Sequence, residues 1–312
     1  MDVSVVIVSW NTRDLLRDCL RSIFQETRST SFEVIVVDNA SRDSTAEMIV
    51  TEFPTVKLIE NRDNRGFAAA NNQGIRESAG RYVLLLNPDT VVLDRAINRC
   101  IGFADLHPDV GVVGCQVLLD ETNIQKTGFA FPTVWNLSLA LSGLSRMFSK
   151  AKFMRTADMG WWGRDDERDL DVISGMFMLI RREALNEVGL LDEAYFVFAE
   201  ETDLCLRLAR AGWRRVFTPS CRIIHVCGGN KSTDQVHAKM FVQLQKSTLI
   251  FFRKNRGATS AAAVKALYVA SNFARAVGWY GQSVLKRDVG RRSKAAAALA
   301  ALRYHVLGTE PQ

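Results

Sequence analysis

The chain has 312 residues, of which 47% are hydrophobic and 24% are charged, and its formal net charge is +6. This is the composition of an ordinary globular protein, without any low-complexity tract. Because single cores stop growing at roughly 250 to 300 residues, we expect one α/β domain over residues 1–256 and a basic helical extension over residues 257–312.

Basic residues gather at the end of the chain. Residues 251–312 contain 11 Lys or Arg against 2 acids, a balance of +9, which leaves −3 for residues 1–250. Such a tail suits an anionic membrane leaflet or a nucleic acid, or it is a solvated helical face. The sequence has no nucleic-acid-binding motif, and the acids of residues 200–203 would repel phosphates. We therefore expect no nucleic-acid partner.

The six cysteines include no CxxC pair and lie mostly in apolar runs, which is typical of reduced thiols in the cytoplasm. We expect no signal peptide, because a short apolar strand follows Met1 and Asp2 directly. Residues 127–145 carry no charge, but Pro132 and Asn136 interrupt them, so a loop is predicted there rather than a membrane span. These features predict a cytoplasmic protein.

Short apolar, β-branched runs recur along the first third of the chain and predict buried parallel strands. They occupy residues 3–8, 34–37, 56–59, 82–86 and 110–113. Helical periods lie between them and begin after caps at Asn11 or Thr12 and at Ser44. This alternation predicts a Rossmann-like, doubly wound, mostly parallel sheet.

The alternation ends near residue 115, and an irregular stretch leads to residue 171. The pattern then predicts a strand over 172–180, a helix over 201–211 and two short strands over 215–218 and 222–226. From residue 231 on, the pattern is helical, with breaks at Gly257 and Gly290.

Polar residues follow each of the first four strands, at the edge where an open α/β sheet binds its ligand. They are Ser9-Trp10-Asn11, Asp38-Asn39-Ala40-Ser41, Asn61 to Gly66 and Asn87-Pro88-Asp89. The lack of a GxGxxG argues against a dehydrogenase, and the lack of a GxxxxGKS or GxxxxGKT argues against a P-loop enzyme. A divalent metal on carboxylate oxygens can still hold a diphosphate. Asp89 is well placed for this, although Asn-Pro-Asp is also a common turn.

Seven sequence strings, in this order, carry a family resemblance. They are VVIVSWNTRDLL, VIVVDNASRDST, NRGFAAANNQGI, RYVLLLNPDT, ISGMFMLIRRE, FVFAEETDLCLRL and IIHVCGG. Together they resemble the family-two inverting glycosyltransferases of GT-A fold, especially the bacterial rhamnosyltransferase-like branch, over residues 3–256. The resemblance implies a GT-A domain that transfers a sugar from a nucleotide-sugar donor.

The resemblance implies one set of residues that bind the nucleoside diphosphate of the donor. They are Ser9, Trp10, Asn11, Asp38, Asn64, Arg65, Gly66 and Asn87. Trp10 would flank the base and Asp38 would bond the base or ribose, whereas a core tryptophan and a helix cap are the structural alternatives. Gly66 would allow close backbone approach and open the next helix.

The resemblance also implies Mg²⁺ or Mn²⁺ at Asp89 and His225. The family's metal motif often has two aspartates flanking one residue, but Asn87 stands at the first position here and cannot supply its charge. His225 matches a position where a histidine reaches the metal or the diphosphate, and a structural histidine is the alternative.

The acceptor side of the family resembles the segment around Glu201. Glu201 matches the second acid of the acceptor-side motif and would be the general base, while Gly175, Glu200 and Asp203 would bind or support the acceptor. Acids in the first turn of a helix also favour the helix dipole, which would explain this cluster without catalysis.

From this resemblance we predict an inverting, metal-dependent glycosyltransferase of surface polysaccharide synthesis. It would move rhamnose from dTDP-rhamnose to a glycan or lipid-linked acceptor, with a UDP-sugar donor as the alternative. The tail would dock on the anionic inner face of the membrane, or pack on the domain or on a second copy of the chain in a homodimer. A catalytically silent scaffold would not need Asp89 and Glu201.

Overall fold

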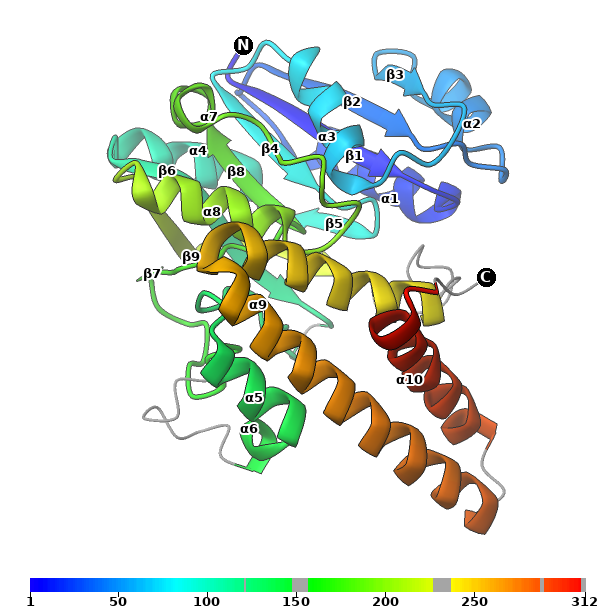
Figure 1. The fold of residues 1–312 in the computed structure, drawn as a ribbon. Helices are drawn as coiled ribbons and strands as arrows, with labels where there is room; N and C mark the ends of the chain where they lie inside the picture. The colour runs from blue at the N-terminus through cyan, green and yellow to red at the C-terminus, as the bar shows by residue number, and fades with distance from the viewer. Residues whose placement is uncertain (121, 148–156, 227–236, 287–288, 310–312) are drawn as a thin grey trace. The chain divides into compact units, whose positions relative to one another are not determined.

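The computed structural model describes the whole chain except residues 121, 148–156, 227–236, 287–288 and 310–312. The chain divides into two compact units (Figure 1). We call them the sheet unit, residues 1–131, 158–196 and 200–232, and the helical unit, residues 132–157, 197–199 and 233–312. The helical unit thus takes in more of the chain than the extension predicted over residues 257–312.

The sheet unit alternates strands and helices along the chain. Its elements are β1 (Val3–Ser9), α1 (Arg13–Glu26), β2 (Phe32–Asp38), α2 (Thr45–Glu52), β3 (Lys57–Glu60), α3 (Phe67–Arg76), β4 (Tyr82–Leu86), β5 (Thr90–Leu93), α4 (Ala96–Leu106), β6 (Val110–Leu118), β7 (Arg168–Asp169), β8 (Phe177–Arg181), α7 (Arg182–Val188), α8 (Glu200–Arg210) and β9 (Arg214–His225). The predicted doubly wound α/β class is confirmed.

The strands form one mixed sheet in the order β3-β2-β1-β4-β8-β6-β9-β5, with β7 beside β9. β3, β2, β1 and β4 run parallel, and β8 lies antiparallel to both β4 and β6. Ser9 at the end of β1 pairs with Asp38 at the end of β2. The polar residues that follow these strands therefore meet at one edge of the sheet.

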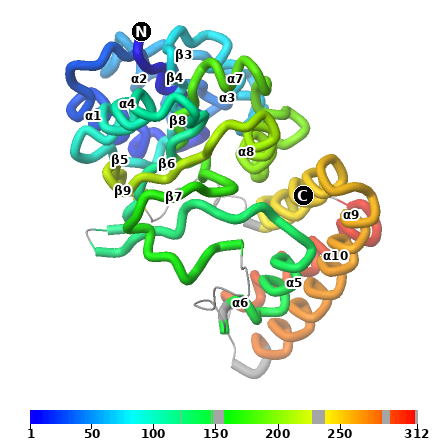
Figure 2. The backbone as a smooth tube through the Cα atoms, turned by 90° about the vertical axis from the view of Figure 1, so that its left-hand side faces the viewer, coloured from blue at the N-terminus to red at the C-terminus, as the bar shows by residue number. Residues whose placement is uncertain are grey.

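Helices cover both faces of the sheet (Figure 2). Val5 and Ile7 of β1 lie in the core that α1, α2 and α4 cover, whereas Val6 lies in the core shared with α3, α7 and α8. Successive strand residues point to opposite faces, so a strand that is covered on both sides is apolar throughout. This explains why unbroken apolar runs predicted these strands.

Some elements differ from their predicted form. The strand predicted over residues 172–180 begins only at Phe177, because a turn at Gly175 and Met176 precedes it. The two short strands predicted over 215–218 and 222–226 are one strand, β9, whose register to β6 shifts after Thr218. Pro219 lies at that shift, where its missing N–H costs no ladder bond.

The helical unit contains α5 (Val134–Ser142), α6 (Leu144–Met147), α9 (His237–Lys286) and α10 (Val289–Leu307). Gly257 interrupts α9 with φ 87° and ψ 167°, which confirms the break predicted there. Gly290 lies within the first turn of α10, so no break occurs at that residue. In the part of the chain that the structure describes, no helix is long and apolar enough to cross a bilayer.

Candidate active site

The loops after β1 and β2 hold the first group of predicted donor-binding residues. The backbone N–H of Asn11 donates to Ser41 Oγ at 2.8 Å, and Asn11 Oδ1 accepts the N–H of Arg42 at 2.8 Å. Ser9 is buried and Trp10 is half-buried between Ser9 and Asn11. The structure therefore brings these three residues together at the end of the sheet.

Asp38, which ends β2, is 4% exposed and only half satisfied. Its Oδ2 accepts the N–H of Ser41 at 3.1 Å, whereas its Oδ1 is buried without a hydrogen-bond partner among the described residues. Burial raises the pKa of this carboxyl, and the bonds from Ser41 oppose that rise. Ser44 is the N-cap residue of α2, so helix capping does not explain Asp38. A buried acceptor without a partner is costly, which favours a ligand donor here.

Asparagine side chains hold the third loop against the second. Asn39 Nδ2 donates to Asn64 Oδ1 at 3.2 Å and to the carbonyl of Gly66 at 3.1 Å. Asn61 Nδ2 donates to Asn39 Oδ1 at 2.9 Å. Asn64, Arg65 and Gly66 thus lie beside the end of β2, and Asn39 and Asn61, which were not predicted as site residues, place them there.

Gly66 precedes α3 with a φ of 83°, a conformation that favours glycine. A Cβ at this position would lie 2.4 Å from the carbonyl oxygen of Phe196. The prediction that Gly66 opens the helix is confirmed. The lack of a Cβ at Gly66 lets the backbone of Phe196 approach closely.

Asp89 lies after β4 and is 9% exposed. Its neighbour Thr90 pairs with His225 in the antiparallel ladder of β5 and β9, which brings His225 Nε2 to 3.1 Å from Asp89 Oδ2. The other ring nitrogen, Nδ1, lies 2.7 Å from Gln125 Oε1. Because that amide oxygen only accepts, Nδ1 carries a hydrogen, and Nε2 is the ring nitrogen that faces Asp89.

The Asp89 and His225 side chains fit a divalent cation. Asp89 Oδ1 is buried and has no hydrogen-bond partner in the described chain. His225 Nε2 and Asp89 Oδ2 lie 3.1 Å apart, and a proton or a cation between them would satisfy both atoms. Within the described residues, no group of three or more His, Cys, Asp or Glu could hold a metal. Mg²⁺ commonly uses one or two carboxylates and takes its other ligands from waters and substrate phosphates.

Glu200 and Glu201 begin α8 in different surroundings. Glu200 is 4% exposed, and burial, together with the negative charge of Glu201, raises its pKa well above the usual range. Glu201 is half-buried as a residue and is the more accessible of the two, although its Oε2 is buried. A general base must be within reach of the proton that it removes. The exposures therefore favour Glu201 over Glu200.

Asp203, which was predicted to support the acceptor and the helix, makes its contacts inside the sheet unit. Its side chain is fully buried, and its Oδ2 accepts from Arg207 Nε at 2.9 Å while its Oδ1 accepts from the Tyr195 hydroxyl at 3.4 Å. Arg207 also donates to the carbonyl of Val188 at 2.6 Å. Asp203 therefore helps to hold α8 in place.

The turn at Gly175 and Met176 connects Glu201 with the loop that carries Asp89. A Cβ on Gly175 would lie 3.9 Å from Glu201 Cβ, so the two residues are neighbours. The next residue, Met176, accepts the N–H of Asn87 at its carbonyl at 3.0 Å. Gln125 Nε2 also donates to Met176 Sδ at 3.7 Å. Gly175 and Met176 thus connect the proposed base with the loop that carries Asp89.

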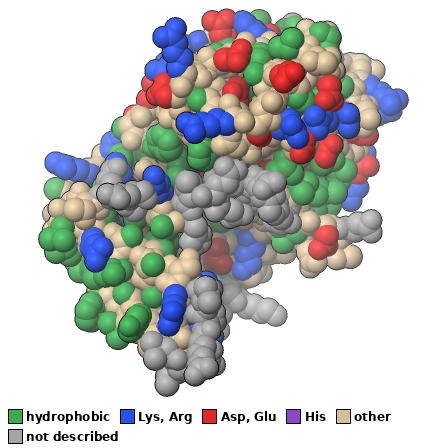
Figure 3. All heavy atoms as spheres, turned by 90° about the vertical axis from the view of Figure 1, so that its right-hand side faces the viewer, with side chains coloured by type: hydrophobic (Ala, Val, Ile, Leu, Met, Phe, Trp, Pro, Cys, Tyr) green, Lys and Arg blue, Asp and Glu red, His purple; other side chains and the backbone are tan. Residues whose placement is uncertain are grey.

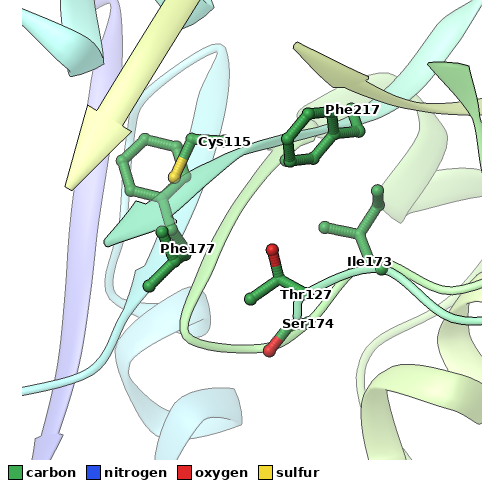
Figure 4. Close-up of a pocket in the computed structure, with 9 residues that line it drawn as sticks. Cys115, Thr127, Ile173, Ser174, Phe177 and Phe217 are labelled. Carbon is green, nitrogen blue, oxygen red and sulfur yellow. The ribbon is translucent and has the colours of Figure 1, made fainter. Parts of the chain in front are cut away.

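An enclosed pocket lies beside this turn (Figure 4). Phe177, Phe217 and Ile173 give it apolar walls, and Ser174 and Thr127 add hydroxyl groups. Its volume is about 10 Å³, roughly the space of one water. The buried Thr127 Oγ1 has no hydrogen-bond partner in the described chain, which suits a water there. A sugar does not fit this pocket.

Comparison with known proteins decides the family. Residues 1–266 match the family described as glycosyltransferase-like family 2. The chain belongs to this family. The resemblance seen in the sequence is thereby confirmed for this glycosyltransferase.

Two known proteins each match about three quarters of the glycosyltransferase. The N-acetylglucosaminyl-diphospho-decaprenol L-rhamnosyltransferase of Mycobacterium tuberculosis is 28% identical over 79% of this chain and 82% of its own. The O-antigen biosynthesis protein RfbC of Myxococcus xanthus is 28% identical over 75% of this chain, but over only 18% of its own length.

A solved structure confirms the GT-A fold of the glycosyltransferase. The mannosyltransferase PcManGT from Pyrobaculum calidifontis, in complex with GDP-Man and Mn²⁺, aligns with a TM-score of 0.58. The alignment covers 99% of this chain and 88% of that chain at 18% sequence identity.

Gln125→Leu is expected to weaken Mn²⁺ binding by the glycosyltransferase about 10- to 100-fold, the usual effect of removing a partner that orients a metal-binding histidine. Leucine keeps most of the volume of Gln125 but removes the acceptor 2.7 Å from His225 Nδ1. Mn²⁺ is titrated against the unfolding temperature, which needs no turnover. Gln116→Leu is the control, since Gln116 bonds the carbonyl of Arg164 instead. Equal Mn²⁺ affinity of the two variants would contradict the role of Gln125.

Proposed function

We propose that this glycosyltransferase moves rhamnose from dTDP-rhamnose, with inversion, to a lipid-linked glycan acceptor of surface polysaccharide synthesis. The observation that carries the proposal is the contact of Asp89 with His225 at the strand ends of the sheet. The turn at Gly175 and Met176 connects the loop of Asp89 with Glu201. The names of the Mycobacterium tuberculosis and Myxococcus xanthus relatives support rhamnose, a diphospho-lipid acceptor and polysaccharide synthesis.

Direct displacement at the anomeric carbon needs one base and a stabilised leaving group. Glu201 would take the proton of the acceptor hydroxyl as its oxygen attacks the sugar and the nucleoside diphosphate departs. Asp89 and His225 would hold Mg²⁺ or Mn²⁺, which supplies positive charge to the departing diphosphate. Asp38 Oδ1 would accept a hydrogen bond from the base or ribose. Attack from one face without a covalent intermediate gives inversion.

A panel of nucleotide sugars tests the donor. Each sugar is added with Mn²⁺, and both the unfolding temperature and the release of nucleoside diphosphate are measured. We expect dTDP-rhamnose to give the largest rise in unfolding temperature, because a ligand at 100 times its Kd stabilises a protein by about 2.7 kcal/mol. Stabilisation by UDP-galactose, UDP-glucose or UDP-N-acetylglucosamine, with none by dTDP-rhamnose, would assign a UDP-sugar donor instead.

We also propose that the protein works at the inner face of the cell membrane. On the helical unit, Figure 3 shows hydrophobic side chains with single Lys or Arg side chains between them. Phe273, Val277 and Tyr280 of α9 are 61%, 59% and 64% exposed, and their spacing puts them on one side of the helix. Apolar residues and cations on one helix suit an anionic leaflet.

A further inference from the structure

In the helical unit, α5 lies beside the part of α9 after Gly257 (Figure 1). Residues of both helices line a groove. Leu141 of α5 and Leu267, Ala274 and Gly278 of α9 line it, and its volume is about 510 Å³. This lies within the usual range for small-molecule sites, about 300 to 1,000 Å³. The small side chains of Ala274 and Gly278, one helical turn apart, keep the groove open. Its lining would bury a hydrocarbon chain.

A cationic cavity adjoins the groove, because Trp279 lines both. Gly290, Arg291 and Lys294 of α10 complete its lining, and its volume is about 290 Å³. Arg275, which lines the groove, has its guanidinium carbon 6.0 Å from the centre of the Trp279 ring. Within the described residues, neither lining includes an Asp or Glu. The groove therefore leads to a cavity lined by two cationic side chains, of which Arg291 also donates to Gln282 Oε1.

We propose that the groove and the cavity together bind a long-chain lipid diphosphate. The part of the hydrocarbon chain next to the diphosphate would lie in the groove, and Arg275, Arg291 and Lys294 would bind the phosphates. The inference rests on the proposed lipid-linked acceptor and assigns the site to its lipid end. A second copy of the chain fits poorly, since residues 251–312 carry a balance of +9 and would repel their own copy.

Two glycines of α9 give a matched pair of variants. Gly278 lines the groove and Gly281 does not. A Cβ at either position meets no heavy atom within 4 Å. Leucine also has a higher helix propensity than glycine, so both variants should fold. Gly278→Leu fills the groove, and Gly281→Leu adds the same side chain outside it.

Binding is measured by calorimetry on the intact protein, without divalent metal, using farnesyl diphosphate as the probe. We expect the wild type and Gly281→Leu to bind it equally, and Gly278→Leu to bind it at least tenfold more weakly. The double variant Arg291→Gln, Lys294→Gln should also lose at least tenfold, whereas Arg292→Gln, outside both linings, should not. Inorganic pyrophosphate and farnesol should each bind at least tenfold more weakly than farnesyl diphosphate.

Equal affinity of Gly278→Leu and Gly281→Leu, or pyrophosphate binding as tight as that of farnesyl diphosphate, would overturn the proposal. Binding to phosphatidylglycerol vesicles distinguishes two possible ligands of the groove, the lipid end of the acceptor and a lipid of the bilayer. It also tests the proposed membrane location. The proposal would also be overturned if the wild type did not bind farnesyl diphosphate but was retained by the vesicles, and Gly278→Leu abolished that retention. The groove would then be a site for bilayer lipid. Donor stabilisation is measured separately, so the donor assignment can fail while the lipid site stands.

Discussion

Asp89→Asn is expected to lower sugar transfer at least 10³-fold while the protein stays folded. The substitution keeps the shape of the side chain but removes the negative charge that faces His225 Nε2 at 3.1 Å. A metal that neutralises a leaving group contributes several kcal/mol to the transition state. A factor of 10³ corresponds to about 4 kcal/mol. Initial rates at saturating donor and Mn²⁺ give the size of the loss, and thermal unfolding checks the fold.

Asp94→Asn is the matched control for this prediction. Asp94 lies five residues after Asp89, directly after β5, and forms a surface ion pair with Arg222. Surface pairs of this kind contribute little to stability, so this variant should retain its activity. Full turnover of the wild type in EDTA would refute the metal role of Asp89.

Glu201→Gln is expected to lower kcat by roughly 10² to 10⁴, which is the usual contribution of a general base. Glutamine keeps the size of the side chain at its half-buried position but cannot take a proton. Donor affinity should change little, because the base acts on the acceptor hydroxyl. Single-turnover rates, together with donor binding measured by thermal shift, separate the two effects.

Glu200→Gln is the comparison within the same pair and should retain most activity. The pKa of Glu200 is raised in the folded protein, so as pH rises past the usual carboxyl range the unfolded chain ionises first. The folded state thereby loses stability toward high pH, and Glu200→Gln removes that loss. The variant should gain unfolding temperature over the wild type at pH 8 and gain little at pH 4. Loss of activity in Glu200→Gln but not in Glu201→Gln would reverse their roles.

Local patterns predicted the parts of the fold that depend on neighbouring residues. The unbroken apolar runs of β1, β2 and β4 follow from burial on both faces, and they give the parallel half of the sheet. The antiparallel insertion of β8 between β4 and β6 depends on contacts between residues far apart in the sequence. The single strand β9 was predicted as two, and the residues between them are the place where its register to β6 shifts.

The candidate site shows the same division. Asp89 and His225 were each selected from a motif, but their contact depends on the pairing of β5 with β9, and β5 was not predicted. Gln125 lies in a stretch that the sequence describes only as irregular, so its bond to His225 needed the fold to be seen. Asp203 was grouped with Glu201 by proximity in sequence. The helix turns its side chain inward to Arg207 instead.

The segment Val197–Ala199 couples the two units through the chain itself. These three residues belong to the helical unit, where Ser247 of α9 donates to the carbonyl of Val197 at 2.7 Å. Glu200 and Glu201 follow directly in the sheet unit. Phe198 and Ala199 have φ of 69° and 68°, a left-handed conformation that costs on the order of 1 kcal/mol per residue. A lipid that displaced α9 would therefore either break the Val197 bond or pull on this short strained link. If α9 holds the proposed lipid site, this link joins that site through the chain to Glu201, the proposed general base.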